Sequence, residues 1–166
     1  MAWICHYASP LGGMTMVSDG ESLLGLCFDG QRRFSTVLPP GIVEGSLPVF
    51  DMTARWLDIY FGGNEPDFMP PLNMQGTDFR QAVWKMLLDI PYGKTMTYGE
   101  VASRLAREQG LKAMSAQAVG GAVGHNPIAI IVPCHRVVGA AGKMVGYGGG
   151  IHRKIALLEM EGTKER

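Results

Sequence analysis

A segment rich in proline and glycine divides the chain into two parts of different character. Residues 62–76 (GGNEPDFMPPLNMQG) place three prolines between glycines at both ends. Because proline and glycine interrupt helices and strands, such a segment is typical of a connection between domains. The sequence therefore predicts an N-terminal α/β domain with its linker over residues 1–75 and a C-terminal domain over residues 76–166.

The first part is predicted to contain strands followed by a helix. Residues 50–61 (FDMTARWLDIYF) carry apolar side chains at helical spacing, and Gly62-Gly63 should end that helix. Before it, short apolar stretches are separated by glycine, proline or aspartate, a pattern that favours strands. The predicted strands are residues 3–7, 14–18 and 22–28.

The second part is predicted to be mainly helical. A helix over 78–89 follows Thr77, a suitable N-cap. Thr97 and Glu100 have the spacing of a capping box that opens a helix ending near residue 107. Ser115 can cap a short helix over 116–124, so the two short helices and their glycine-containing turn indicate a helix-turn-helix.

The end of the chain completes an α+β pattern. Residues 128–132 form an apolar, β-branched run that predicts a buried strand, and residues 152–161 form a last helix that Gly162 should end.

The helix over 116–124 consists mostly of alanine and glycine, with Gln117 as its one long polar residue. A reader of the major groove would carry more polar side chains, so small residues favour close approach in the minor groove. Tight packing between helices is the alternative interpretation.

The charge distribution and the cysteine content indicate the kind of partner and the cellular compartment of the protein. Residues 1–75 hold three Lys/Arg against eight Asp/Glu, and residues 76–166 hold twelve against seven. This balance of −5 and +5 suggests that the C-terminal part meets a polyanion, although ordinary surface variation explains it equally well. Three cysteines, with neither a signal sequence nor an apolar run of membrane-spanning length, predict reduced thiols in the cytoplasm.

Cys134 differs from the other two cysteines in its neighbours. It follows a proline and is followed directly by His135 and Arg136. Cationic neighbours lower the pKa of a thiol and populate the nucleophilic thiolate. Cys5 and Cys27 lack a charged cluster beside them and are interpreted as small hydrophobic residues. The sequence therefore identifies Cys134 as the candidate nucleophile.

With this motif in place, the chain resembles the O6-alkylguanine-DNA alkyltransferases, or methylated-DNA–protein-cysteine methyltransferases. The resemblance covers residues 76–162 and extends more loosely to SPLG at residues 9–12. It implies a small ribonuclease-H-like N-terminal domain and a helical, winged-helix-like C-terminal domain with a helix-turn-helix. The matching segments are FRQAVWKMLLDIPYGKTMTYGEVA, AVGGAVGHNP, IIVPCHRVVG, GYGGG and LLEMEG.

The family resemblance implies DNA repair by a single-turnover alkyl transfer. The alkyl group of O6-alkylguanine, or of O4-alkylthymine, would pass to Cys134 after the protein binds the minor groove and flips the base. His135 resembles the base that takes the thiol proton through a water, and Glu161 the acid that orients it. Asn126 resembles the residue that braces the active-site turns, and Tyr98 the hydroxyl that donates to the purine.

The resemblance also implies residues that hold the base and the duplex. Val137, Tyr147 and Gly148 match positions of the base pocket. Gln117 stands where many members carry an arginine that fills the gap left by the flipped base, and Ala129 stands where some carry a proline that narrows the pocket. The turn over 108–112 is longer than usual. The expected DNA contacts are Ser115, Gln117, Ala118, Gly121, Ala122 and Arg136.

These expectations define the partners and the competing hypotheses. We expect a monomer that binds double-stranded DNA containing O6-alkylguanine, with no cofactor and no membrane. A zinc site lacks support, since Cys5, His6 and Cys27 do not make four ligands. The alternatives are a DNA-binding regulator without chemistry and a cysteine hydrolase, which would turn over repeatedly.

Overall fold

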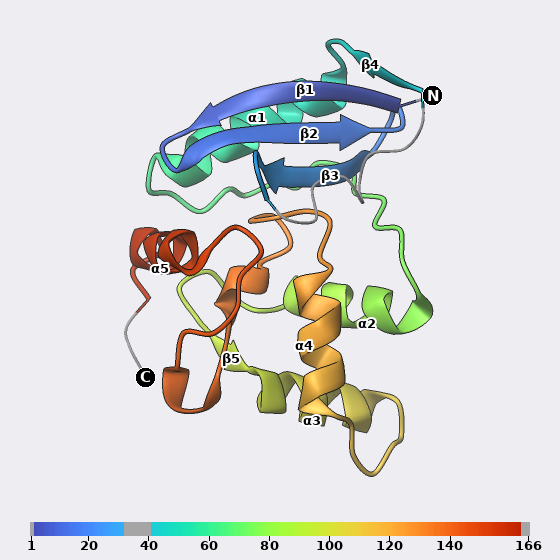
Figure 1. The fold of residues 1–166 in the computed structure, drawn as a ribbon, viewed down its shortest axis with the longest axis vertical. Coiled ribbons are helices and arrows are strands. Elements are labelled where there is room, and N and C mark those ends of the chain that lie inside the picture. Colours follow the sequence, from blue (N-terminus) through green and yellow to red (C-terminus); the bar gives the residue numbers. More distant parts are fainter. Residues whose placement is uncertain (1, 32–40, 164–166) are drawn as a thin grey trace. The chain divides into compact units, whose positions relative to one another are not determined.

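The computed structural model describes residues 2–31 and 41–163 (Figure 1). Helices and strands are both present, so the predicted α+β class is confirmed. The chain divides into two compact units. One unit comprises Met1–Gln75 with Pro127–Ala129, and the other comprises Gly76–Asn126 with Ile130–Arg166. Among the described residues, no helix has both the length and the apolar character needed to cross a membrane.

The N-terminal unit is built on a sheet with the strand order β3-β2-β1-β4. β1, β2 and β3 are antiparallel and correspond to the predicted strands; β1 and β2 are longer than predicted, and β3 is one residue shorter. The short edge strand β4, parallel to β1, is not among the predicted strands. Its three residues are too few to produce a recognisable alternation of side chains. The bounds are β1 Ala2–Ser9, β2 Gly12–Ser18, β3 Leu23–Phe28 and β4 Ile42–Glu44.

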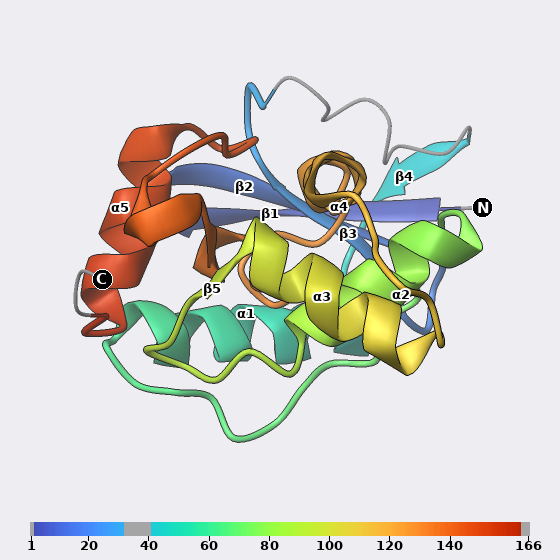
Figure 2. The same ribbon diagram turned by 90° about the horizontal axis from the view of Figure 1, so that it is seen from below.

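Helix α1 (Pro48–Phe61) runs along one face of this sheet (Figures 1 and 2). It begins at Pro48 rather than at residue 50, because proline at the first helical position has a φ suited to a helix and needs no hydrogen-bond acceptor. The Tyr7 hydroxyl donates to Asp58 of α1 at 2.6 Å. The helix buries an apolar face in the core of the unit; its buried residues are Val49, Phe50, Thr53, Trp56, Leu57 and Tyr60.

The C-terminal unit contains the predicted helices with their predicted caps (Figure 2). Thr77 accepts a bond from the Arg80 amide, and Ser115 accepts one from the Ala118 amide. Thr97 and Glu100 form the reciprocal capping box. These contacts lie within single turns, so local sequence determines them. The bounds are α2 Asp78–Leu87, α3 Tyr98–Glu108, α4 Ala116–Gly124 and α5 Ile151–Met160.

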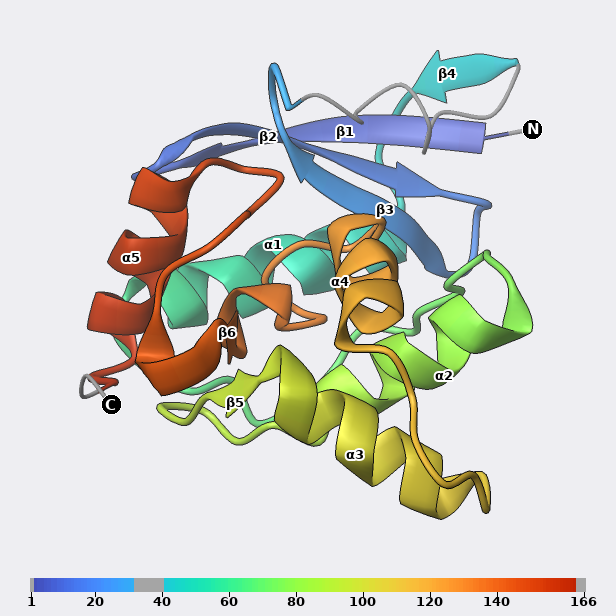
Figure 3. The same ribbon diagram turned by 60° about the horizontal axis from the view of Figure 1, so that its bottom comes forward.

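A two-stranded parallel ladder joins two distant segments of this unit (Figure 3). β5 (Met96–Thr97) leads directly into α3, and β6 (Val137–Val138) follows the 3-10 turn η2 (Cys134–Arg136). A second 3-10 turn, η3 (Ala140–Gly142), follows β6. The ladder therefore links the start of α3 to the turn that carries Cys134.

The prediction of a buried strand over residues 128–132 is wrong. All of these residues are buried, but only Ile128 forms an isolated bridge, with Leu26. The Ala129 amide donates to the Leu26 carbonyl at 2.8 Å, and the chain then turns through Ile130, whose φ is 68°. Burial explains the apolar residues, and apolar character alone does not distinguish a buried turn from a buried strand.

Candidate active site

Cys134 lies at the start of turn η2 and is 8% exposed. Its backbone amide donates to the Val132 carbonyl at 2.8 Å, and the Asn126 side-chain amide donates to the same carbonyl at 2.9 Å. Asn126 is thus bonded to the backbone just before the turn that carries the cysteine. The three cysteines, all within the described residues, are thiols that form no disulfide.

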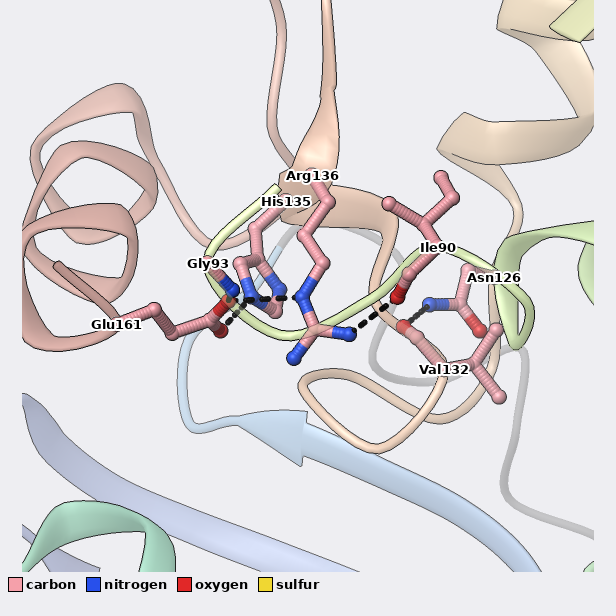
Figure 4. Close-up of polar contacts among 7 residues, drawn as sticks. All are labelled: Ile90, Gly93, Asn126, Val132, His135, Arg136 and Glu161. Carbon is pink, nitrogen blue, oxygen red and sulfur yellow. Dashed lines mark hydrogen bonds and ion pairs between the residues drawn. The ribbon is translucent and has the colours of Figure 1, made fainter. Parts of the chain in front are cut away.

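His135, the residue that follows Cys134, forms a fully buried pair with Glu161 (Figure 4). The ring nitrogen Nε2 lies 2.6 Å from Glu161 Oε2, and both side chains have no exposed surface. Glu161 is the C-cap of α5, and Gly162, with φ 70°, directs the chain away from the helix. The end of α5 therefore holds the carboxylate against the histidine.

Two further donors hold the Glu161 carboxylate. Arg136 Nε donates to Glu161 Oε1 at 2.8 Å, and the Gly93 amide donates to the same oxygen at 3.2 Å. Arg136 also donates through Nη1 to the Ile90 carbonyl at 2.8 Å (Figure 4). Burial alone would raise the pKa of Glu161, but the bonds and charges of His135 and Arg136 lower it to about 2. The carboxylate is therefore ionised at neutral pH.

The protonation of His135 follows from this environment. Burial lowers the pKa of His135; the bond and charge of Glu161 raise it in part, while the charges of Arg136 and Lys154 lower it further. The ring is therefore neutral at pH 7. Ionised Glu161 only accepts hydrogen bonds, so the single ring proton is assigned to Nε2. Nδ1 then carries the lone pair that can take a proton, which makes His135 a base.

A buried lysine is the component of the site that sequence reasoning missed. Lys154 Nζ donates to the carbonyls of Val137 at 2.6 Å, Val145 at 2.8 Å and Gly146 at 3.5 Å. An ammonium has three protons, and these carbonyls accept all three. Burial lowers the pKa of Lys154 to about 8, against the opposing effect of Cys134. Lys154 therefore ties β6 to the segment before α5 and places a cation near the thiol.

The thiol itself is protonated at rest. Burial raises the pKa of Cys134, while a hydrogen bond from Asn126, the charge of Lys154 and backbone amides lower it in part. The charged side chains predicted to activate the thiol, His135 and Arg136, are not among these effects, and the lowering effects that are present do not outweigh the loss of hydration. Forming the thiolate therefore needs a base, and the adjacent His135 is in the right state to act as one.

The remaining residues predicted to contact the base differ in how far they are buried. Tyr98 is the first residue of α3, and burial followed by the charge of Cys134 raises its pKa, so its hydroxyl stays protonated. Val137 is fully buried and gives its carbonyl to Lys154. Tyr147 is half-buried and Gly148 exposed, in the segment that Lys154 and Arg153 hold by its carbonyls.

The residues predicted to contact DNA separate into two groups. Ser115, Gln117, Ala118 and Gly121 are exposed on α4. The other two are buried. Ala122 is 2% exposed, because its carbonyl accepts the indole N–H of Trp84 at 2.8 Å where α2 packs on α4.

Arg136 is 9% exposed and its guanidinium is held by Glu161 and the Ile90 carbonyl. Its expected contact with phosphate is therefore replaced by a structural role inside the protein. Within the part of the chain that the structure describes, no group of three or more His, Cys, Asp or Glu side chains could hold a metal ion.

A buried thiol that adjoins a neutral histidine and an ionised glutamate is an arrangement typical of proteins that use cysteine as a nucleophile. Comparisons with known proteins identify the family. The 6-O-methylguanine DNA methyltransferase DNA-binding domain matches residues 78–163. The methylated-DNA–protein-cysteine methyltransferase of Mycobacterium tuberculosis is 45% identical over 167 residues, which cover 96% of this chain and 93% of that protein. The Mycobacterium leprae protein of the same name is 44% identical over 156 residues, covering 92% and 88%.

The structural comparison agrees. The structure of Mycobacterium tuberculosis OGT in complex with DNA has a TM-score of 0.84 and 44% identity, covering 96% of this chain and 92% of that one. The chain belongs to the family of methylated-DNA–protein-cysteine methyltransferases. This confirms the predicted class, a DNA-repair alkyltransferase, in preference to a regulator or a hydrolase.

Proposed function

We propose that this protein repairs O6-alkylguanine in double-stranded DNA by moving the alkyl group onto Cys134 Sγ, once per molecule. The observation that carries this proposal is the buried Cys134, followed directly by His135, whose Nε2 lies 2.6 Å from Glu161 Oε2. O4-alkylthymine, which presents a comparable alkyl–oxygen bond, is a second substrate. The thioether product is stable and nothing in the site would cleave it, so one molecule performs one transfer.

The first step is removal of the thiol proton. Ionised Glu161 holds the Nε2 proton of His135, which leaves Nδ1 to accept the proton of Cys134 through a bridging water. The resulting imidazolium is stabilised by the same carboxylate, and the thiolate by the cation of Lys154. Because the thiol is protonated at rest, the nucleophile forms only as the proton moves.

The second step transfers the alkyl group. The Sγ electron pair forms a bond to the alkyl carbon, and the carbon–oxygen bond breaks with its electrons passing to the purine. The Tyr98 hydroxyl donates its proton to the purine, which leaves as neutral guanine. Tyr98 recovers a proton from solvent and His135 returns its own to solvent, so charge and atoms balance without a cofactor.

The substrate base reaches this buried thiol only if it leaves the duplex. We assign DNA contact to the exposed residues of α4, namely Ser115, Gln117, Ala118 and Gly121. Their small size suits close approach in the minor groove. Gln117 is the one long side chain among them and is assigned to the gap left by the flipped base. Val137, Tyr147 and Gly148 are assigned to the pocket that holds the base.

We also propose the fold type of each unit, the oligomeric state and the cellular compartment. The N-terminal unit is ribonuclease-H-like, and the C-terminal unit is winged-helix-like with α3 and α4 as its helix-turn-helix. The protein acts as a monomer, because every residue of the proposed chemistry comes from one chain. Three thiols without a disulfide favour the reducing cytoplasm. Sedimentation of the protein alone and on a short duplex would test the monomer.

Label transfer from an O6-methylguanine duplex tests the central proposal. We expect one methyl per protein by intact mass, located on Cys134 by peptide mapping. Cys134→Ala should lose transfer completely and keep its affinity for the duplex, and Cys5→Ala serves as the matched control that keeps both. Label on another cysteine, or product in molar excess over protein, would contradict the proposal.

The assignment of Gln117 has a separate test. Extruding a base costs a few kcal/mol, and a cationic side chain in the gap should offset more of this than a neutral amide. Gln117→Arg should therefore raise the ratio of transfer rates, duplex over free O6-alkylguanine base, several-fold. Gln109→Arg adds the same charge at an exposed site beyond the end of α3 and should leave the ratio unchanged. A rise in both variants would mean that charge alone is responsible.

A further inference from the structure

A row of polar side chains crosses the whole sheet of the N-terminal unit, away from the proposed chemistry. His6 of β1 pairs in register with Thr15 of β2, and their side chains lie 3.1 Å apart. The Thr15 hydroxyl donates to Asp29, just beyond β3, at 2.7 Å. On the other side, His6 Nε2 lies 3.0 Å from Glu44 Oε1 in β4. The row Asp29–Thr15–His6–Glu44 therefore follows the strand order β3-β2-β1-β4.

The number of hydrogen-bond protons that this row needs determines whether the His6 ring must be charged. The row has three contacts, and both ends are carboxylates, which only accept once ionised. Thr15 has one hydroxyl proton and gives it to Asp29. His6 must then donate through Nδ1 to the Thr15 oxygen and through Nε2 to Glu44. A neutral ring carries one proton and can complete only two of the three contacts, so the complete row requires an imidazolium.

Loss of that proton affects the contacts unequally. Thr15 is 1% exposed, so its hydroxyl keeps its protein partners. The side chains of His6 and Glu44 are 58% and 71% exposed, and water can replace their contact at little cost. The contact to β4 is therefore the one that fails first. β4 is a three-residue edge strand, and the Gly45 amide, which donates to the Ile4 carbonyl at 3.2 Å, is the hydrogen bond just beyond it.

We propose that His6 is a proton-dependent latch that holds the edge strand β4 on the sheet, closed when the ring is charged and loosened when it is neutral. The described groups that face the ring are Thr15 and Glu44 directly, and Asp29 through Thr15. Cys5 contributes only a contact from its Sγ to the His6 carbonyl at 3.9 Å. Tyr7 and its partner Asp58 belong to the opposite face, since neighbouring residues of a strand alternate. Opening would bare the edge of β1 to another strand.

Amide exchange of the full-length protein tests the latch. The protection factor of the Gly45 amide, corrected for intrinsic exchange, should fall about two- to fivefold between pH 5.5 and pH 8, the range expected for an exposed ion pair. His6→Gln and Glu44→Gln should remove this dependence on pH. Asp58→Asn, which removes a carboxylate contact from the neighbouring residue Tyr7, is the matched control and should retain it.

A second measurement guards against variants that fold poorly. Nitrogen NMR of the wild-type ring shows whether one or both His6 nitrogens carry a proton, and Gly45 protection should fall as the second ring proton is lost. Protection of Gly45 that is independent of pH in the wild type would overturn the proposal. So would the same pH dependence in His6→Gln, or a loss of Gly45 protection that does not follow the loss of the ring proton.

Discussion

Two histidine–glutamate pairs in this chain have similar geometry and opposite properties. His135 and Glu161 are 2.6 Å apart with no exposed side-chain surface, whereas His6 and Glu44 are 3.0 Å apart and more than half exposed. In the buried pair, loss of hydration keeps the histidine neutral although it touches a carboxylate. In the exposed pair, the hydrogen-bond row is complete only with a charged ring.

The difference shows that the surroundings of a pair, rather than its distance, decide what it can do. Around Glu161, Arg136 and the Gly93 amide supply donors in addition to His135, and the contacts with His135 and Arg136 keep the carboxylate ionised. In the proposed reaction His135 acts as the base. Around His6, acceptors lie on both sides and water is close, so the ring itself has to supply the charge. The first pair suits proton transfer and the second suits a weak contact that depends on pH.

Glu161→Gln should produce the largest effect of any change in the two pairs. It leaves the buried Arg136 without its carboxylate, a loss of about 3 to 5 kcal/mol in the free energy of unfolding. It also removes the acceptor that fixes the ring proton, so transfer by the folded variant should fall about 100- to 10,000-fold, the contribution of a general base. Urea denaturation and single-turnover transfer measure the two effects.

Glu44→Gln is the control for that comparison. It makes the same chemical change in the exposed pair, and we expect a loss below about 1 kcal/mol with normal transfer. Similar losses of stability in both variants would mean that burial does not separate the pairs.

Acid should distinguish the pairs in the unmodified protein. The pKa of Glu161 falls from 4.5 to about 2 on folding, so its contribution is present above pH 4.5 and is lost as the pH falls towards 2. The full contribution is about 3 kcal/mol. Denaturant unfolding at pH 5, 4 and 3 should show this loss in the wild type and in Glu44→Gln, and a much smaller one in Glu161→Gln. Equal acid sensitivity in all three proteins would contradict the lowered pKa.

High pH should reveal the contribution of the buried Lys154 to the free energy of unfolding. Lys154 has a pKa lowered to about 8, so above pH 8 the unfolded chain binds a proton that the folded protein has lost. Its contribution to stability therefore rises with pH, by about 2 kcal/mol at pH 9.5. Lys154→Met should lack this rise, and Lys85→Met, at an exposed position of α2, should keep it. Free energies of unfolding at pH 7.5 and 9.5 provide the measurement.

The fold could be predicted where local chemistry determines it. Thr97 with Glu100, and Ser115, specify helix starts within single turns, and these predictions are confirmed. Strands of two or three residues have too few side chains to show a period, so β4, β5 and β6 were missed. Residues 128–132 were assigned to a strand because their apolar character reports burial and gives no sign of the turn at Ile130.

The site could be predicted where the residues adjoin or where the family resemblance supplied them. Cys134 and His135 are neighbours in sequence, whereas Glu161 followed from the resemblance alone. The donors that hold Glu161, Gly93 among them, come from distant segments and have no local signal. Lys154 did have one: it shares the spacing of Leu157, Leu158 and Glu161 on the buried face of α5, where a lysine needs buried acceptors.

The smallest effect concerns the coupling within the exposed pair. A double-mutant cycle of His6→Gln and Glu44→Gln measures the interaction between the two side chains separately from their other contacts. Exposed ion pairs contribute about 0.2 to 1 kcal/mol, and here the attraction requires the proton on His6. The coupling should therefore lie in this range while the ring is charged, and it should be larger at pH 5.5 than at pH 8 because acid favours the charged ring. The corresponding cycle for His135 and Glu161 should show a larger coupling that persists at pH 8, because its carboxylate binds a neutral ring. A coupling in the exposed pair that is equal at both pH values would mean that a neutral His6 already donates to Glu44. In that case the hydrogen bond between Thr15 and Asp29 is the one lost when the ring is neutral. The two histidine–glutamate pairs would then differ only in their interaction energy.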